Sequence, residues 1–337
     1  PTGEVTISGD AIEDAVLTAE TATIADEDGL GTFAYRWMRD GVELSGATAA
    51  SYTLSQADVG AAISVEVRYT DTYGTEESLT SATTDPVVNV NDAPTGAVVI
   101  EGTEAEDQTL TANVSSIADE DGLGAFSFRW LRDGAEISGA TAATLSLTQA
   151  DVGAAIISEV FYTDAFGAEE TLASIATGPI QNVNDAPIGA LGVTGDAREN
   201  ETLTADPSAI SDEDGLGTFS FRWMRDGVEI SGESDATYTL TSEDIGTSIT
   251  AEVSYTDAQG ADESVTSAAS AIIQAAGLNL VGTPDADTLS GAEFDDTLTG
   301  LDGADRFIGN SGNDSILGGL GADTLNGGDG DDIIIGG

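Results

Sequence analysis

The C-terminal part of the chain repeats a nine-residue pattern without a gap from Gly282 to Ile335. The six nonapeptides read GTPDADTLS, GAEFDDTLT, GLDGADRFI, GNSGNDSIL, GGLGADTLN and GGDGDDIII. Each begins with glycine, and each has a large apolar residue at its eighth position. The sixth position is always aspartate, at Asp287, Asp296, Asp305, Asp314, Asp323 and Asp332. Helices repeat every 3.6 residues and strands every two, so a period of nine requires a different kind of fold.

The residue types in this pattern suit a repeated cation-binding turn. Glycine permits tight turns with positive φ and leaves carbonyl oxygens accessible. Calcium takes six to eight oxygen ligands, from carboxylates and backbone carbonyls alike. The apolar residue two places after each aspartate begins a short strand and points inward. Residues 282–337 carry twelve acidic residues against one arginine, so we expect this segment to need a metal ion in order to fold.

The nonapeptides resemble the RTX family of calcium-binding repeats, whose pattern is G-G-x-G-x-D-x-U-x. The resemblance implies a parallel β-roll with two nonapeptides in each turn and calcium ions between the glycine-rich loops of stacked turns. It implies that loops two repeats apart share ions: Asp305 with Asp323, Asp314 with Asp332, and Asp296 with Asp314. The expected ligand residues are Asp287, Asp296, Gly303, Asp305, Gly312, Asp314, Gly319, Gly321, Asp323, Gly328, Gly330 and Asp332.

The first two nonapeptides depart from the RTX pattern. They lack the glycine pair, and Asp285 and Phe294 replace the glycine at position four. Ion binding by these two repeats is therefore left open, and a role as a cap is the alternative. The alternative without a function is that the whole segment consists of acidic surface turns or is disordered. Such a segment would have no reason to repeat an apolar residue every nine positions. The pattern stops at Gly337 within a repeat, so we expect the sequence to be a piece of a longer protein.

The rest of the chain contains three copies of a 93-residue unit. Trp37, Trp130 and Trp223 are 93 residues apart, and the motifs DEDGLG and NVNDAP recur at the same interval. Such a unit is too long for a solenoid repeat and suits a separate domain. We predict three modules and a roll, with the boundaries 1–92, 93–185, 186–275 and 280–337.

Each module is predicted to be a β-sandwich of about seven short strands. In the first module Phe33, Tyr35 and Trp37 alternate with polar or small residues, and Asp40-Gly41 predicts a hairpin turn. No segment longer than one turn has a helical pattern. The predicted fold class is all-β: three tandem immunoglobulin-like β-sandwiches followed by a calcium-binding parallel β-roll.

The modules resemble bacterial immunoglobulin-like domains found in tandem in large RTX surface proteins. The tryptophan strand, the motif RDG and the strand ISVEVRYTD carry this resemblance. We expect the tryptophans to lie in the core. The position that holds a cysteine in antibody domains is Val65, Ser158 or Ala251 here, so packing alone must join the sheets. Around Ser158 the apolar phase of the second copy looks disturbed.

Acidic clusters recur in each module and have two interpretations. Asp, Asn and Gly start and close turns whatever their function. The alternative is calcium at the module junctions, because NVNDAP is similar to the linker of cadherin-type repeats, in which adjacent modules share ions. The residues of this second prediction are Asp26, Asp28, Asp71, Asp92, Asp119, Asp121, Asp164, Asp185, Asp212, Asp214 and Asp257.

Composition excludes several functions. The formal net charge is −52, and the chain has no lysine, histidine or cysteine. Nucleic acid and anionic lipid are therefore improbable partners. Catalytic triads, thiol nucleophiles, Schiff bases and histidine zinc sites are impossible. No apolar run reaches the ~18 residues of a membrane span, and no signal peptide is evident.

The sequence therefore predicts a non-enzymatic segment of a secreted bacterial protein. The RTX resemblance implies type I secretion, an extracellular or cell-surface location, and a role in adhesion or matrix building after folding in external calcium. Calcium is the expected cofactor, the expected state is a monomer, and any cell-surface or matrix ligand is unidentified. The alternative is an appendage of a secreted RTX enzyme whose catalytic domain lies outside this chain. Sugar binding by a sandwich face would require exposed aromatic residues.

Overall fold

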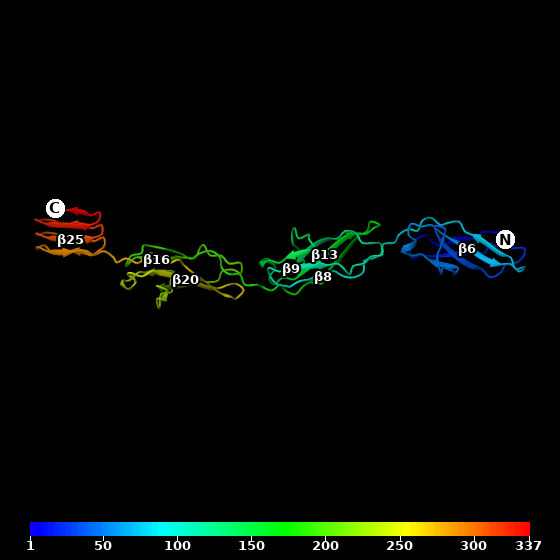
Figure 1. Ribbon diagram of the computed structural model, residues 1–337, viewed down its shortest axis with the longest axis horizontal. Coiled ribbons are helices and arrows are strands. Elements are labelled where there is room, and N and C mark those ends of the chain that lie inside the picture. The colour runs from blue at the N-terminus through cyan, green and yellow to red at the C-terminus, as the bar shows by residue number, and fades with distance from the viewer. The chain divides into compact units, whose positions relative to one another are not determined.

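The computed structural model describes residues 1–337 and is built almost entirely of β-strands (Figure 1). Its only helical elements are three 3₁₀ turns of three residues each. None of them is long and apolar enough to cross a membrane. The chain divides into two compact units, Pro1–Asn182 and Val183–Gly337. The prediction of an all-β fold is confirmed.

The first unit contains two sandwiches of the same construction, drawn from blue to green in Figure 1. Each pairs a three-stranded antiparallel sheet, β1-β2-β5 or β12-β9-β8, with a four-stranded one, β4-β3-β6-β7 or β11-β10-β13-β14. The first module has β1 (Thr6–Ser8), β2 (Val16–Glu20), β3 (Ala34–Arg39), β4 (Val42–Glu43), β5 (Ser51–Thr53), β6 (Ile63–Thr70) and β7 (Glu76–Thr80). The second has β8 (Val99–Glu101), β9 (Thr109–Asn113), β10 (Ser127–Arg132), β11 (Ala135–Glu136), β12 (Thr144–Ser146), β13 (Ile156–Thr163) and β14 (Glu169–Ala173).

The second unit begins with a third sandwich of the same type, with sheets β15-β16-β19 and β18-β17-β20-β21. Its strands are β15 (Gly192–Thr194), β16 (Thr202–Asp206), β17 (Ser220–Arg225), β18 (Val228–Glu229), β19 (Thr237–Thr239), β20 (Ile249–Thr256) and β21 (Asp262–Thr266). Seven strands in each module match the number that the sequence predicts.

A tryptophan lies at the centre of each sandwich, as predicted. Trp37, Trp130 and Trp223 are fully buried, and each indole N–H donates to a backbone carbonyl. Ser158 pairs directly with Trp130 and is itself fully buried. Ile156, Ser158 and Val160 all face inward, so the apolar phase of the second module is intact and the disturbance expected there is absent.

The hairpins and corners follow from local sequence. Asp40 and Gly41 have φ of 49° and 78°, which is the left-handed conformation that a two-residue hairpin turn needs. A 3₁₀ turn ending at Asp58 precedes β6. Its buried carboxylate accepts hydrogen bonds from Arg39 and from the Tyr52 hydroxyl, and so joins the two sheets. Packing and this polar contact replace the disulfide of antibody domains.

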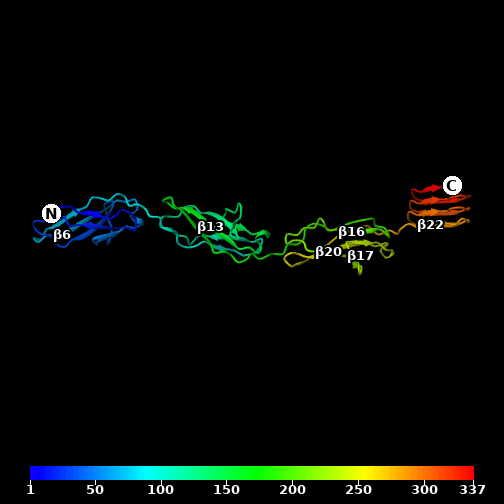
Figure 2. The same ribbon diagram turned by 180° about the vertical axis from the view of Figure 1, so that it is seen from behind.

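A parallel β-roll completes the second unit and is drawn from orange to red in Figure 2. One sheet has the order β22-β24-β26-β28 and the other β23-β25-β27. The strands are β22 (Asn279–Val281), β23 (Thr288–Ser290), β24 (Thr297–Thr299), β25 (Arg306–Ser311), β26 (Ser315–Leu317), β27 (Thr324–Asp329) and β28 (Ile333–Ile335). Paired residues such as Leu298 and Ile316 are two nonapeptides apart, so two nonapeptides do make one turn.

The roll has one strand more than the six nonapeptides. Strand β22 pairs with β24 and directs Leu280, nine residues before Leu289, toward the small core. The centre of that core is Leu298, Phe307 and Ile316, all almost fully buried. At the C-terminal edge the corresponding Ile334 remains 46% exposed. Burial of the eighth position is thus complete only in the middle of the roll.

Candidate functional site: the stacked aspartates and the module linker

The aspartates of the nonapeptides form two hydrogen-bonded stacks. In each stack, the backbone N–H of one aspartate donates a hydrogen bond to Oδ1 of the aspartate two repeats later. The donor–acceptor pairs are Asp287–Asp305 at 2.8 Å, Asp296–Asp314 at 2.7 Å, Asp305–Asp323 at 3.0 Å and Asp314–Asp332 at 2.9 Å. The sequence predicted that loops two repeats apart would share ions, and these contacts bring those loops together.

The other carboxylate oxygen divides the stacks into two groups. In the first two repeats, Oδ2 of Asp287 and Asp296 accepts the backbone N–H of Thr283 and Ala292, respectively. In the next two repeats, Oδ2 of Asp305 and Asp314 is buried and has no partner. Both of these side chains are 1% exposed. A buried, unpaired anionic oxygen is unfavourable unless a cation binds it.

The electrostatics of Asp314 agree with that requirement. Burial, together with the nearby carboxylates of Asp296, Asp332 and Asp295, raises the pKa of Asp314. Carboxylate oxygens, backbone carbonyls and a concentrated negative charge are what calcium prefers. The residues of the roll therefore fit calcium, and Asp305 and Asp314 fit it better than Asp287 and Asp296.

Backbone conformation separates the same two groups of repeats. The glycines predicted as ligands, which are Gly303, Gly312, Gly319, Gly321, Gly328 and Gly330, have φ between +99° and +140°. Even Leu301 and Asn310, at position two of the third and fourth repeats, adopt φ of 79° and 80°. No residue at the corresponding positions of the first two repeats has a positive φ. The loop that would surround an ion thus begins at the third repeat.

Glycine at the first position of each nonapeptide is explained by crowding. A Cβ on Gly309 would lie 1.9 Å from Oδ2 of Asp314 and 2.2 Å from the carbonyl oxygen of Gly327. A Cβ on Gly300 would meet Oδ2 of Asp305 at 2.5 Å. A larger residue would displace either the aspartate of its own repeat or the next turn of the roll.

The sequence of the roll matches one described family, the RTX calcium-binding nonapeptide repeat, at residues 281–316 and 308–337. Residues 281–337 are RTX calcium-binding repeats. This match covers the RTX roll and none of the three modules, and it supports Ca²⁺ as the cofactor of the RTX roll. Among curated proteins, no sequence is significantly similar to the chain.

Several solved structures resemble the chain at low identity. One is described as a Ca²⁺-stabilized adhesin that helps an Antarctic bacterium bind ice: identity is 13%, coverage 84% of this chain and 80% of that one, and TM-score 0.26. Another consists of the three N-terminal domains of the bacteriophage RB49 outer capsid protein Hoc: identity is 16%, coverage 79% of this chain and 96% of that one, and TM-score 0.21. A third is the ICAM-5 D1–D4 ectodomain: identity is 14%, coverage 81% of this chain and 74% of that one, and TM-score 0.34.

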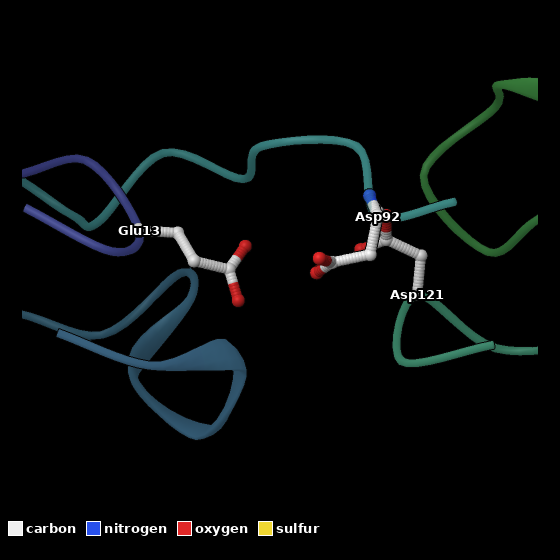
Figure 3. A group of neighbouring side chains, drawn as sticks. All are labelled: Glu13, Asp92 and Asp121. Carbon is white, nitrogen blue, oxygen red and sulfur yellow. Dashed lines mark hydrogen bonds between the residues drawn. The ribbon is translucent and has the colours of Figure 1, made fainter. Parts of the chain in front are cut away.

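A second acidic site lies where the first linker, Asn89–Pro94, meets the second module. Glu13, Asp92 and Asp121 each bring one carboxylate oxygen within 4.8 Å of the others (Figure 3). Backbone contacts hold this geometry: Val90 N–H donates to Glu13 Oε2 at 3.2 Å, and Asp92 N–H donates to Asp121 Oδ2 at 2.7 Å. The name linker site is used below for Glu13, Asp92 and Asp121.

Burial and mutual repulsion make the linker site unfavourable without a cation. Glu13 and Asp121 are 4% and 2% exposed. Burial raises the pKa of Glu13, and the charges of Asp92 and Asp121 raise it further. The pKa of Asp92 is also raised, by burial and then by Asp121.

The side-chain amide of Gln56 provides independent evidence for a missing ligand at the linker site. Gln56 donates from Nε2 to Asp121 Oδ1 at 3.0 Å, yet its Oε1 is buried without a partner. Glu13 and Gln56 were missed by sequence reasoning. The recurrence of glutamate at Glu13, Glu106 and Glu199, 93 residues apart, was a signal that could have found Glu13.

The structure places the other predicted junction residues in three settings. Asp26, Asp119 and Asp212 each accept a tyrosine hydroxyl hydrogen bond. Asp28 is exposed, whereas Asp121 and Asp214 at the same position are buried. Asp71, Asp164 and Asp257 close the loop after the strand that carries the tyrosine.

In the second unit, Asp185 N–H donates to Asp214 Oδ2 at 2.8 Å, as Asp92 does to Asp121. Turn chemistry accounts for part of these contacts, and ligation by them stays a prediction.

The connection from the third module to the RTX roll has different chemistry. Ala276 N–H donates to Glu199 Oε2 at 3.3 Å, which repeats the contact of Glu13. However, the position of Asp92 is taken by Leu278, whose N–H donates to Asp296 in the RTX roll. Arg198 lies 3.6 Å from Asp295. This connection thus has an apolar residue in place of Asp92 and a guanidinium beside Asp295.

Proposed function

We propose that this chain is a calcium-binding, non-catalytic stalk and RTX roll segment of a secreted bacterial surface or adhesion protein. In this proposal the three modules, at 1–92, 93–185 and 186–275, space the protein outward from the cell. The RTX roll, at 280–337, folds when it meets extracellular calcium. The observation that carries the proposal is the pair of buried, unpartnered carboxylate oxygens on Asp305 and Asp314.

Charge explains why calcium would act as a folding switch. Twelve acidic residues and one arginine lie between Gly282 and Gly337. Only Leu298, Phe307 and Ile316 are almost fully buried apolar residues in the RTX roll. So small a core cannot offset the repulsion of stacked carboxylates, and cation binding supplies the missing free energy. Calcium is millimolar outside cells and scarce inside them, so folding would follow export.

The linker site supports a second role for calcium in the same proposal. An ion bound by Glu13, Asp92 and Asp121 would neutralise carboxylates contributed by both modules and the linker between them. The unpartnered Oε1 of Gln56, whose Nε2 donates to Asp121, would add a further oxygen ligand. Such an ion would restrict the motion of the linker.

Hydrogen exchange of the full chain tests both parts. In chelator, amides of residues 282–337 should exchange within seconds, while those of β6, β13 and β20 remain protected by their tryptophan cores. Millimolar calcium should protect the RTX roll and also residues 88–95. Magnesium at the same concentration should do neither, because it demands a smaller octahedral site and keeps its water. Full protection of residues 282–337 in chelator would refute the switch.

Location requires its own test. An antibody against the three modules should label intact source cells or their medium without permeabilisation. Labelling only after permeabilisation would refute the surface assignment and leave the calcium chemistry untouched.

A further inference from the structure

One carboxylate oxygen of Asp164 is buried in the second module without a partner. The side chain is 7% exposed. Its Oδ1 accepts the backbone N–H groups of Phe166, Gly167 and Ala168 at 2.8, 2.6 and 2.9 Å. Its Oδ2 is buried and accepts nothing. Loop geometry thus fully accounts for one oxygen and leaves the other unexplained.

The third module repeats this arrangement in detail. Asp257 is 6% exposed, and its Oδ1 accepts the N–H groups of Gln259, Gly260 and Ala261 at 2.8, 2.6 and 2.9 Å. Its Oδ2 is again buried without a partner. Two independent modules therefore leave the same oxygen bare.

The first module differs from the other two at this loop, because Asp71 has no buried oxygen without a partner. Asp71 accepts the N–H groups of Tyr73 and Thr75 through Oδ1, both at 2.8 Å. Hydrogen bonds from the amide and the hydroxyl of Thr75 help to lower the pKa of Asp71. At the position of Thr75 the other modules have Ala168 and Ala261, which offer no hydroxyl. The bare oxygen occurs where the threonine is missing.

Asp164 and other carboxylates act together on the Tyr162 side chain of the second module. The Tyr162 hydroxyl donates to Asp119. Burial raises the pKa of Tyr162, and so do the carboxylates of Asp119, Glu170 and Asp164. Ala165 N–H donates to the carbonyl oxygen of Asp121 at 3.2 Å, which brings the two loops together.

Both arginines of the second module are engaged elsewhere. Arg129 pairs with Glu159, and Arg132 pairs with Asp151. Neither arginine therefore pairs with Asp119 or Asp164. The third module repeats the tyrosine contact, from Tyr255 to Asp212.

We propose that Asp164 and Asp257 each bind a divalent cation, with calcium the best match, through the bare Oδ2 and the neighbouring aspartate, Asp119 or Asp212. We expect no such site in the first module, where Asp71 has no buried oxygen without a partner and Thr75 contributes a hydroxyl. This site is additional to the linker site and does not require an ion there, although both would belong to the proposed calcium-dependent stalk.

Terbium luminescence of the full chain provides a selective test. Terbium replaces calcium at oxygen sites and emits when a nearby tyrosine is excited. The RTX roll contains no tyrosine or tryptophan, so ions bound there stay dark. Asp164→Asn keeps an oxygen for the three N–H groups and removes the charge. In a Glu13→Gln background, which removes the linker site, Asp164→Asn should abolish about half of the tyrosine-sensitised emission, and Asp164→Asn with Asp257→Asn nearly all, since the sites are independent.

Three further variants separate this inference from the proposed function. Asp71→Asn should leave the emission unchanged. Glu13→Gln should remove calcium from the linker site and leave most of the emission. Ala168→Thr, which imitates the first module, should weaken terbium binding while the module stays folded by circular dichroism. If the double variant binds terbium as the parent does, water satisfies the bare oxygens and the inference fails, whatever happens at the linker site. If Glu13→Gln instead abolishes the emission, the signal belongs to the linker site and the inference also fails.

Discussion

Replacement of Asp314 by asparagine should cost the calcium-bound RTX roll two ion sites. The carboxylate accepts Asp296 N–H through Oδ1 at 2.7 Å, and asparagine preserves this contact. Its Oδ2 is buried and bare, and the loop lies between those of Asp296 and Asp332. At free calcium 100 times Kd, one site contributes about 2.7 kcal/mol to folding. The loss of two shared sites should therefore weaken the folded RTX roll by about 5 kcal/mol.

The assay is hydrogen exchange of RTX roll peptides across a calcium titration, with module peptides as the internal reference. Asp287→Asn is the matched control, because Oδ2 of Asp287 already accepts Thr283 N–H and should contribute little to ion binding. The titration midpoint should move to higher calcium in Asp314→Asn and hardly move in Asp287→Asn. Equal shifts in the two variants would refute the distinction between the early and the later repeats. An unchanged midpoint in Asp314→Asn would refute ligation by Asp314.

Three further predictions concern backbone, core and pH. Gly309→Ala should prevent calcium-induced protection of the RTX roll, whereas Gly336→Ala, where a Cβ meets nothing within 4 Å, should titrate like the parent. Ser158→Ala should stabilise the second module by about 1 kcal/mol in calorimetry, because the buried hydroxyl has no partner; Ser174→Ala, which removes the acceptor of Ser158 N–H, should destabilise it instead. Because burial raises the pKa of Asp314 in the folded state, its charge opposes folding at neutral pH, and this cost declines as pH falls through the raised pKa. Acidification should therefore increase protection around Asp314 in chelator, yet release calcium when calcium is present; the opposite trend in chelator would contradict the assignment.

Much of this protein could be predicted from local periodicity. A nine-residue period with glycine, aspartate and an apolar residue in fixed phase predicts stacked turns, and the structure pairs Leu298 with Ile316 accordingly. Period-two alternation predicted the buried face of β6, and the 93-residue repeat carried the assignment to the other modules. At Ser158 the sequence suggested a broken phase that the structure does not show. A polar residue at an inward position makes the buried face of a strand less apolar, but its side chain still points to that face.

The candidate cation sites depend on contacts between distant segments, and no short sequence period predicts these contacts. Asp287 and Asp314 occupy the same place in the repeat, but only the loop around Asp287 turns a backbone N–H toward its Oδ2. Glu13 and Asp121 meet only because a linker and two modules place them together. Strand β22 belongs to the RTX roll although its repeat has Leu278 in place of aspartate. Sequence spacing therefore determined which residues share a face, since side-chain direction follows backbone geometry. Tertiary structure decided which carboxylate oxygens remain without a donor, because that depends on how distant segments compete for the same hydrogen bonds.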